Sequence, residues 1–433
     1  VRILAPQPYM ISIINRLFKK KNNLNFVKSK LQILDNTTNV SLIFDLINNF
    51  SEDSEVRFVG GCLRKILSGE EIDDIDLATN LEPSQVCEIL SKNKIQFYES
   101  GIEHGTVTAK IKNTKFEITT LRKDLITDGR HATVGFSKNW YDDASRRDFT
   151  INSIYSDLDG NIFDPFNGKK DLENGEVKFI GNQESRIKED YLRILRYLRF
   201  FLNYSKNNHS ENLKKIIRKN IDGISKISSE RLLDELKKIF KSKKLLNLNK
   251  DKFLVEIIQL IFPQLKNLNI LNNLNETQKS IITSNDFFFI ISVIIIDETD
   301  NSDYFIYKFN ISNEQKNRIK LLSKFYLENL KKNIFTEHNL WKILYQNNKE
   351  LLNDVINFHI VRDKSSLKKL VKFKEFFRDK EAPKLNVNAK YIMEKFNIKE
   401  GPSVGHTLKK IEKHWMDNQF KISEEKISEI VNS

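Results

Sequence analysis

The sequence predicts an α+β fold, in which a region of mixed strands and helices is followed by an all-α remainder. Between about residues 40 and 166, short runs rich in β-branched and aromatic residues alternate with turns, as strands do. After about residue 181 the apolar residues recur at helical spacing. Only seven prolines and fourteen glycines interrupt the whole chain. The two regimes therefore meet near residue 170, and long helices are expected after it.

Three runs in the first region have the composition of strands: residues 56–59, 106–111 and 115–120. In the second region, stretches such as 230–240 and 314–330 combine Leu, Ile, Lys and Asn without a helix breaker. They predict helices of a packed α-helical body.

The charge of the chain indicates a polyanionic partner. Its 71 Lys and Arg residues exceed its 58 Asp and Glu residues by 13, which favours RNA, DNA or an anionic membrane surface. The longest apolar run, residues 287–296, is about half as long as a membrane-spanning helix, so we expect a buried segment and no membrane. Cys62 and Cys87 are too few for a disulfide framework, as is typical of a reducing compartment.

The first 35 residues are predicted to form a basic extension. They contain no acidic residue before Asp35, whereas five lysines lie between positions 19 and 30. A transit peptide is the alternative, although such peptides are rich in Arg and Ser rather than in Lys and Asn. We therefore expect the protein in the cytoplasm, with an organelle matrix as the second choice.

A pair of glycines, Gly60 and Gly61, follows the first predicted strand and precedes a short helical pattern. Glycines at such a turn let the backbone approach a ligand closely, and the next helix would direct its free N–H groups at a phosphate. Arg64 in the first turn would add a full positive charge. An ordinary strand-to-helix turn is the alternative.

Three carboxylates form a candidate metal site. Asp74 and Asp76 are two residues apart, so in a strand both would lie on one face. Glu117 alternates with Phe116 and Ile118 and would point away from the face that these two bury. If the strands that carry the three acids are neighbours, the acids converge beside the glycine turn, as two-metal phosphoryl transfer requires. The alternative is a solvated strand end.

Two further segments carry clustered arginines. Residues 146–152 begin with Arg146 and Arg147, whose guanidinium groups suit phosphate, although a solvated helix start fits them too. We expect one helix through residues 187–199, with an apolar stripe and with Asp190 and Arg193 as adjacent side chains. These two could form a plain i, i+3 salt bridge or read the edge of a base. The polar stretch 123–140, which contains residues 128–131, is predicted to be a loop near the site.

Together these motifs resemble those of the class II CCA-adding enzymes, the tRNA nucleotidyltransferases, in both sequence and order. The matching segments are 60–64 (GGCLR), 74–79 (DIDLAT), 103–106 (EHGT), 116–122 (FEITTLR), 128–132 (DGRHA), 146–152 (RRDFTIN), 189–196 (EDYLRILR) and 227–231 (ISSER). The resemblance implies a polymerase-β-type nucleotidyltransferase palm, with a mixed sheet and helices, followed by an all-α neck, body and tail.

The resemblance also implies template-independent addition of CCA to the 3′ end of tRNA from CTP and ATP. Asp74 and Asp76 would bind Mg²⁺, with Glu117 as the third catalytic carboxylate. The other implied roles concern the nucleotide. Gly61, Arg64 and Arg147 would hold it, and Asp190 and Arg193 would select its base. Arg196 and Arg199 would support its binding, and the loop at 128–131 would help the switch from C to A. The body and tail would grip the acceptor and TΨC arms of tRNA through phosphates and shape.

One position departs from the family pattern: Lys65 follows the arginine of the first motif, where the family usually has Asp. This departure puts nucleotide affinity and metal dependence in question, whereas the intact Asp74–Asp76 pair supports the class. The alternatives are a bacterial poly(A) polymerase, a CC-only or A-only tRNA nucleotidyltransferase, and, remotely, an inactive RNA-binding protein. The motif at 103–106 favours CCA addition over the poly(A) polymerases.

We expect five regions along the chain. They are a basic extension at 1–35, a nucleotidyltransferase head at 36–180, a helical neck with the nucleotide-selecting helix at 181–245, a helical body at 246–380, and a helical, tRNA-binding tail at 381–433.

Overall fold

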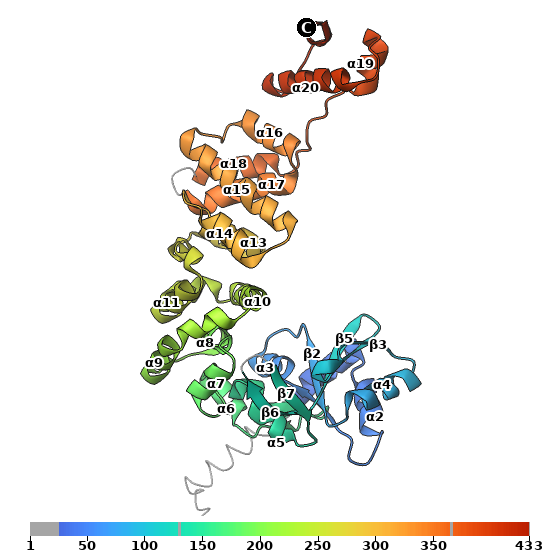
Figure 1. The fold of residues 1–433 in the computed structure, drawn as a ribbon, viewed down its shortest axis with the longest axis vertical. Helices are drawn as coiled ribbons and strands as arrows, with labels where there is room; N and C mark the ends of the chain where they lie inside the picture. Colours follow the sequence, from blue (N-terminus) through green and yellow to red (C-terminus); the bar gives the residue numbers. More distant parts are fainter. Residues whose placement is uncertain (1–25, 129–130, 364–366, 433) are drawn as a thin grey trace, which may run out of the picture. The chain divides into compact units, whose positions relative to one another are not determined.

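The computed structural model describes residues 26–128, 131–363 and 367–432. The chain divides into two compact units, Val1–Lys244 and Leu245–Ser433. Every strand of the described residues lies in the first unit, and the second unit is helical (Figure 1). The predicted α+β class, with strands first and helices after them, is confirmed. The finer division into head, neck, body and tail stays a prediction.

Seven strands of the first unit form a mixed sheet in the order β3-β4-β5-β2-β1-β8-β9. Strands β2 and β5 are parallel neighbours, and the other pairs are antiparallel. The strands are β1 Val56–Val59, β2 Ile75–Thr79, β3 Gln96–Gly101, β4 Thr106–Ile111, β5 Thr114–Thr120, β8 Tyr155–Ser156 and β9 Ile162–Phe163. The three predicted strands are confirmed as β1, β4 and β5.

Helices of the first unit pack on this sheet and continue beyond it. They are residues 26–38, α2 Ser41–Asn48, α3 Gly61–Ser68, α4 Pro83–Lys92, α5 Trp140–Arg146, α6 Gly168–Asn174, α7 Gln183–Glu189, α8 Arg193–Tyr204, α9 Glu211–Lys219 and α10 Ser229–Phe240. Short 3₁₀ turns lie at Ile102–His104, Thr150–Asn152 and Ile221–Lys226. Phe58 and Phe116 are wholly buried in the core, together with Val27 and Leu31 of the first helix. Residues 26–35 of the predicted extension thus belong to the folded unit, and residues 1–25 lie outside the described residues.

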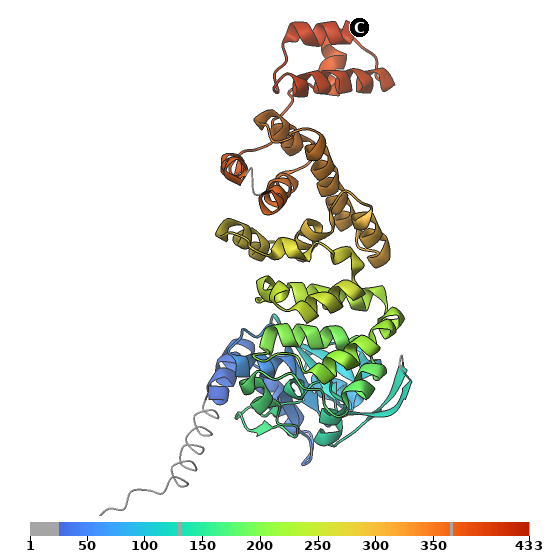
Figure 2. The same ribbon diagram turned by 90° about the vertical axis from the view of Figure 1, so that its left-hand side faces the viewer.

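The stretch 123–140 is not the loop that the sequence suggested. Strands β6 (Arg122–Asp128) and β7 (His131–Phe136) pair as an antiparallel hairpin with a register shift between Asp124 and Ile126. Figure 2 shows this hairpin, in teal, projecting from the edge of the first unit. The prediction was wrong because polar residues interrupt the alternation of β-branched residues that marks a strand. Of the segment 128–131, residues 129 and 130 lie outside the described residues.

The single helix predicted through residues 187–199 is also wrong. Helix α7 ends at Glu189, Asp190 has an extended backbone (φ −152°, ψ 103°), and α8 begins at Arg193. The apolar residues Ile187, Ile194, Leu195 and Leu198 are still fully buried. Tyr191, the remaining residue of the expected stripe, lies between the two helices and is only partly buried, so the helices bury the other four although the backbone breaks between them.

The second unit contains α-helices and short 3₁₀ turns throughout its described residues. The helices are α11 Lys252–Ile261, α12 Glu276–Ser284, α13 Phe287–Ile295, α14 Asn301–Phe309, α15 Asn313–Lys331, α16 Glu337–Gln346, α17 Lys349–Arg362, α18 Leu367–Phe377, α19 Ala389–Phe396, α20 Pro402–Asp417 and α21 Glu424–Asn432. The 3₁₀ turns are Leu245–Lys250, Pro263–Leu265 and Leu268–Leu271. Helix α13, the longest apolar run, is almost entirely buried, as predicted. Over the described ranges, no helix is both long and apolar enough to cross a bilayer.

Candidate active site

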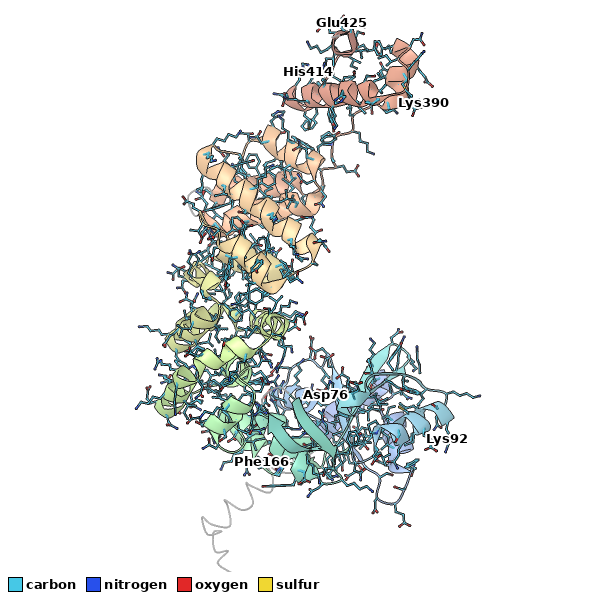
Figure 3. The ribbon with its side chains drawn as sticks, viewed as in Figure 1. Asp76, Lys92, Phe166, Lys390, His414 and Glu425 are labelled. Carbon is cyan, nitrogen blue, oxygen red and sulfur yellow. The ribbon has the colours of Figure 1, made fainter. Side chains whose placement is uncertain are left out.

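The two glycines form a tight turn against an acidic side chain. Gly60 has a φ of +66°, which favours glycine, and Gly61 begins α3. A Cβ atom on Gly61 would lie 3.3 Å from Oδ2 of Asp76, and one on Gly60 would lie 3.5 Å from Nη1 of Arg147. The turn therefore lets the backbone approach both Asp76, marked on β2 in Figure 3, and Arg147.

The strands that carry the carboxylates are neighbours, as the candidate metal site required. Asp76 of β2 stands opposite Glu117 of β5 in the parallel register, and Asp74 immediately precedes β2. Phe116 and Ile118 are buried whereas Glu117 is exposed. The prediction that Glu117 points away from the buried face is confirmed.

Burial and the charges of neighbouring acids raise the pKa values of Asp76 and Glu117. The pKa of Asp76 is raised, chiefly by burial and also by the charge of Asp74, although Arg147 opposes the rise. The pKa of Glu117 is raised by burial, then by the charges of Asp76 and Asp74. Clustered carboxylate oxygens of this kind suit a divalent cation. Among residues 26–128, 131–363 and 367–432, no three His, Cys, Asp or Glu side chains are already arranged around a common metal position.

Arg147 is fixed by a buried acid. Its guanidinium donates to Oδ2 of Asp143 at 2.9 Å and to the hydroxyl of Tyr155 at 3.0 Å, and Arg146 donates to Oδ1 of Asp143 at 3.0 Å. Burial alone would raise the pKa of Asp143, but the charges of Arg147 and Arg146 and the Tyr155 hydrogen bond hold it well below its usual range. Asp143 thus orients both arginines of the segment.

A hydrogen-bonded relay joins α3 to α8. Arg64, which is buried, donates to Oδ1 of Asn152, and Nδ2 of Asn152 donates to Oδ1 of Asp148 at 2.8 Å. Oδ2 of Asp148 accepts from Nε of Arg196 at 2.7 Å. Burial would raise the pKa of Asp148, but Arg196 and Asn152 outweigh it and lower that pKa. The segment 146–152 therefore anchors two of the predicted nucleotide-binding arginines.

Three guanidinium groups lie close to one aromatic ring. The guanidinium carbons of Arg64, Arg196 and Arg199 lie 4.7, 5.6 and 4.1 Å from the ring centre of Phe200. Arg199 also donates to the buried Glu235 of α10. The ring offsets part of the repulsion between the three like charges.

Asp190 and Arg193 have separate ion-pair partners. Arg193 donates to Oε2 of Glu189 at 2.7 Å and to the backbone carbonyl of Arg186 at 2.8 Å. Oδ2 of Asp190 accepts from Nη2 of Arg231, on α10, at 2.8 Å. The plain salt bridge between Asp190 and Arg193 that the sequence allowed is therefore not the pairing that these side chains adopt, because the helix breaks between them.

These residues meet in a cavity of about 420 Å³, which we call the arginine cavity. Its lining residues are Gly60, Gly61, Arg64, Asp76, Arg146, Arg147, Asp148, Asn152, Asp190, Arg193, Arg196, Arg199 and Phe200. The structure thus brings together all the predicted nucleotide-binding residues with Asp76. Asp74 and Glu117 are not in the lining. They lie beside it, immediately before β2 and opposite Asp76.

A larger cavity, of about 1140 Å³, shares Arg64 and Arg199 with the arginine cavity. Lysines from α10 and the residues after it, and the acidic loop that precedes β2, supply much of its remaining lining. It lacks the glycine turn, Asp76 and Asp190. The smaller cavity is therefore the one that combines the glycine turn and Asp76 with Asp190 and Arg193, the predicted base-reading pair.

Several residues in the cavity lining or in contact with it were not singled out by sequence reasoning. Asp148 and Asn152 belong to the matched motif at 146–152, so the motif was the available signal for them. Arg231 is the last residue of the matched motif at 227–231, whereas Phe200 and Glu235 carried no signal for a role at the site. Lys65, the departure from the family pattern, pairs through Nζ with Oδ1 of Asp73, which also accepts the backbone N–H of Asp74 at 2.9 Å.

Two families match separate parts of the chain, one after the other. Residues 56–178 match the Poly A polymerase head domain. Residues 210–268 match the family described as "Probable RNA and SrmB- binding site of polymerase A". The first match contains the glycine turn, all three carboxylates and the segment 146–152.

Named enzymes from other organisms are similar in sequence to part of the chain. Human mitochondrial CCA tRNA nucleotidyltransferase 1 is 46% identical over 191 residues, which make up 43% of this chain and 44% of that protein. The CCA-adding enzyme of Lactobacillus johnsonii is 39% identical over 189 residues, 43% of this chain and 46% of that protein. The matches span less than half of the length of these relatives.

Solved structures share the fold over most of the chain. The CCA-adding enzyme of Bacillus stearothermophilus in complex with CTP has a TM-score of 0.66 at 21% identity, covering 91% of this chain and 96% of that chain. The Thermotoga maritima CCA-adding enzyme complexed with tRNA has a TM-score of 0.61 at 20% identity, covering 93% and 98%. Residues 56–178 are thus identified as a Poly A polymerase head domain, and more than nine-tenths of the chain shares the fold of these CCA-adding enzymes.

Proposed function

We propose that this protein adds CCA to the 3′ end of tRNA from CTP and ATP, without a nucleic-acid template, and releases pyrophosphate. The arginine cavity carries the proposal, because it places a glycine turn, Asp76 and a base-reading pair, Asp190 and Arg193, around one space. The names of the human and Lactobacillus johnsonii relatives support the same activity.

The triphosphate is bound by the glycine turn and the arginines. Gly60 and Gly61 let the start of α3 lie close to Asp76 and Arg147, and the first turn of this helix would present backbone N–H groups to a phosphate. Arg64 and Arg147 contribute guanidinium groups that are already oriented by Asn152 and Asp143. Preorganised donors of this kind bind anionic oxygens with little reordering of the protein.

Asp74 and Asp76, with Glu117 beside them, are the residues that would hold Mg²⁺. Their oxygen donors fit this hard cation, and the raised pKa values of Asp76 and Glu117 reflect burial and, after it, repulsion between the acids, which a cation would relieve. When bound, Mg²⁺ lowers the pKa of the attacking hydroxyl and stabilises the leaving pyrophosphate. In the reaction the 3′ oxygen of tRNA forms a bond to the α-phosphorus of the nucleotide, and the bond from that phosphorus to pyrophosphate breaks.

The base is selected by Asp190 and Arg193. Cytosine and adenine both present an exocyclic amino group beside an unprotonated ring nitrogen, so a carboxylate can accept from the first and a guanidinium can donate to the second. Uracil and guanine present a carbonyl oxygen beside a ring N–H, which opposes both groups. Arg196 and Arg199 support nucleotide binding from α8, where Asp148 and Glu235 fix them.

The helical body and tail, residues 246–380 and 381–433, would grip the acceptor and TΨC arms of tRNA. The net charge of +13 supports contacts to phosphates, which recognise A-form RNA by its shape. Affinity for tRNA should then fall steeply as salt rises, and a flat salt dependence would contradict this part of the proposal. The segment 128–131 would assist the switch from C to A.

The protein is proposed to act in the cytoplasm or, alternatively, in an organelle matrix. The vertebrate relatives at 44–46% identity are named as mitochondrial proteins, which supports the second compartment. Fractionation of cells that express the full chain would distinguish the two.

A poly(A) polymerase is the second candidate, because the head-domain family carries that name. One experiment separates the candidates: extension of a tRNA transcript that lacks its last three nucleotides, with Mg²⁺ and CTP, ATP or both, resolved to single nucleotides. Three additions that require both nucleotides are expected. A long ladder from ATP alone would indicate a poly(A) polymerase, and a product that stops after CC, or that gains only A, would indicate a partial enzyme. Retained tRNA binding with no extension would indicate an inactive RNA-binding protein.

A further inference from the structure

Both oxygens of the Asp190 carboxylate are engaged in the structure. Oδ1 accepts the backbone N–H of Leu192 at 3.1 Å, and Oδ2 accepts Nη2 of Arg231 at 2.8 Å. The first contact ties the carboxylate to the start of α8, whose first turn also uses the backbone carbonyl of Asp190. The second contact comes from α10, 41 residues later in the chain. Local and long-range contacts together fix the plane of the carboxylate.

A second ion pair joins the same two helices. Glu235 lies one helical turn after Arg231 on α10 and accepts from Arg199 of α8. Its side chain is almost completely buried, and Arg199 lines the arginine cavity. Helix α10 therefore presents a cation and an anion, four residues apart, to two residues that line the cavity. This arrangement fixes the position of Arg231 relative to α8.

The pairings keep the two base-reading groups apart. Arg193 is engaged by Glu189 and by the Arg186 carbonyl, while Asp190 is engaged by Arg231. If Arg231 were absent, the carboxylate of Asp190 could turn toward Arg193, its nearest sequence neighbour of opposite charge in the cavity lining. Such a pair would consume the acceptor and the donor that a base needs. A carboxylate bound to two fixed donors keeps lone pairs available for a third.

From these contacts we infer that Arg231 is a positioning residue that determines nucleotide specificity. It holds the Asp190 carboxylate in the orientation that accepts a hydrogen bond from the amino group of cytosine or adenine. The inference rests on the proposed function, since it concerns the base that Asp190 and Arg193 read. Arg231 acts through Asp190 and does not line the cavity itself. UTP and GTP are rejected because a fixed carboxylate faces their carbonyl oxygen, and a carboxylate that can turn away loses this repulsion.

A purely structural role would have a different signature. The side chains of Arg231 and Asp190 are 51% and 27% exposed, and ion pairs with such exposure add little to stability. Removal of Arg231 should therefore leave the fold intact and change which nucleotide is chosen. Loss of a structural contact would instead lower the melting temperature and affect all nucleotides equally.

The experiment compares the full-length wild type with Arg231→Gln and Arg231→Lys. The control is Lys237→Gln, which breaks the exposed pair between Lys237 and Asp234 on the same helix. For each protein, kcat/KM for CTP and for UTP is measured on a tRNA transcript that lacks CCA, together with the melting temperature. We expect the preference for CTP over UTP to fall by about tenfold or more in Arg231→Gln, the effect of losing one charged hydrogen bond.

The other variants sharpen this result. Arg231→Lys keeps the charge but not the planar donor group, so its preference should lie between those of the wild type and Arg231→Gln. Lys237→Gln should match the wild type. In an Asp190→Asn background, Arg231→Gln should cause no further loss, because both changes act on the same carboxylate.

Two results overturn the inference. An Arg231→Gln variant with unchanged discrimination would remove Arg231 from base selection, even if the wild type adds CCA. An equal loss for CTP and UTP together with a lower melting temperature would assign it a structural role. If the wild type itself adds no nucleotide, the proposed function fails and the inference fails with it. If the wild type adds CCA but Arg231→Gln keeps its discrimination, only the inference fails, so the two failures are distinguishable.

Discussion

Asp76 and Glu117 face each other across the two parallel strands of an otherwise antiparallel sheet, and the charge of Asp76 adds to the burial that raises the pKa of Glu117. Strands β3 and β4 lie between β2 and β5 in the sequence but beyond β5 in the sheet. Strands β2 and β5 are therefore neighbours, and their two carboxylates come into register. This pairing supports the proposal that phosphoryl transfer takes place beside the glycine turn.

Asp76→Asn should reduce nucleotide incorporation by at least about a hundredfold, because it removes a charge that is required where the transition state is stabilised. The change is nearly isosteric, so tRNA affinity and the melting temperature should not fall. Single-turnover incorporation of CTP and a filter-binding assay measure the two effects. Asp53→Asn, on an exposed loop residue before β1, is the control, and full activity of Asp76→Asn would refute the metal-site assignment.

Arg64→Lys should raise KM for both CTP and ATP by about tenfold, since a lysine keeps the charge but loses the guanidinium contacts to Asn152 and the Phe200 ring. Steady-state kinetics with each nucleotide check this prediction. The matched control is Arg57→Lys, because Arg57 stacks on Trp140 at 4.2 Å outside the arginine cavity. Equal KM values for Arg64→Lys and the wild type would show that Arg64 does not hold the triphosphate.

Lys65, which stands where the family usually has Asp, should be tolerated. It pairs with Asp73, whose side chain is 69% exposed, and an exposed pair is worth at most about 1 kcal/mol. Lys65→Ala should therefore lower kcat/KM by less than about fivefold. The exchange of both charges, Lys65→Asp with Asp73→Lys, should restore the wild-type value. A loss as large as that of Asp76→Asn would mean that Lys65 takes part directly in the reaction.

Asp143→Asn should destabilise the protein in a pH-dependent way. Because the folded-state pKa of Asp143 is depressed, its ionised form stabilises the folded protein above the unfolded pKa of about 3.9, and this contribution disappears as pH falls through the folded pKa. The variant should lose about 3 kcal/mol of unfolding free energy at pH 7, the cost of breaking a buried ion pair.

Urea denaturation of the wild type and Asp143→Asn at pH 7 and at pH 3 measures this difference, which should shrink at the lower pH. Asp45→Asn, at an exposed position of α2, should have little effect at either pH. A difference that is constant with pH would show that the hydrogen bonds of Asp143, rather than its charge, stabilise the turn before Phe149.

The sequence was sufficient for features that depend on local pattern. The strands at 56–59 and 106–111, the glycine turn and the outward position of Glu117 follow from residue type and alternation. The break at Asp190 was not predictable in this way, because the residues on both sides keep the same apolar stripe. The partners Arg231 and Glu235 lie 41 and 36 residues from the side chains they bind, and such pairing depends on how α10 packs against α8.

The claim that nucleotide choice resides in the protein is tested most directly by sequencing the 3′ ends that the wild type makes. A tRNA transcript that lacks CCA is incubated with Mg²⁺ and equal concentrations of all four nucleoside triphosphates. We expect the extended molecules to end in CCA, with no U or G and no further addition. Ends that contain several A residues in a row, or all four nucleotides, would contradict it.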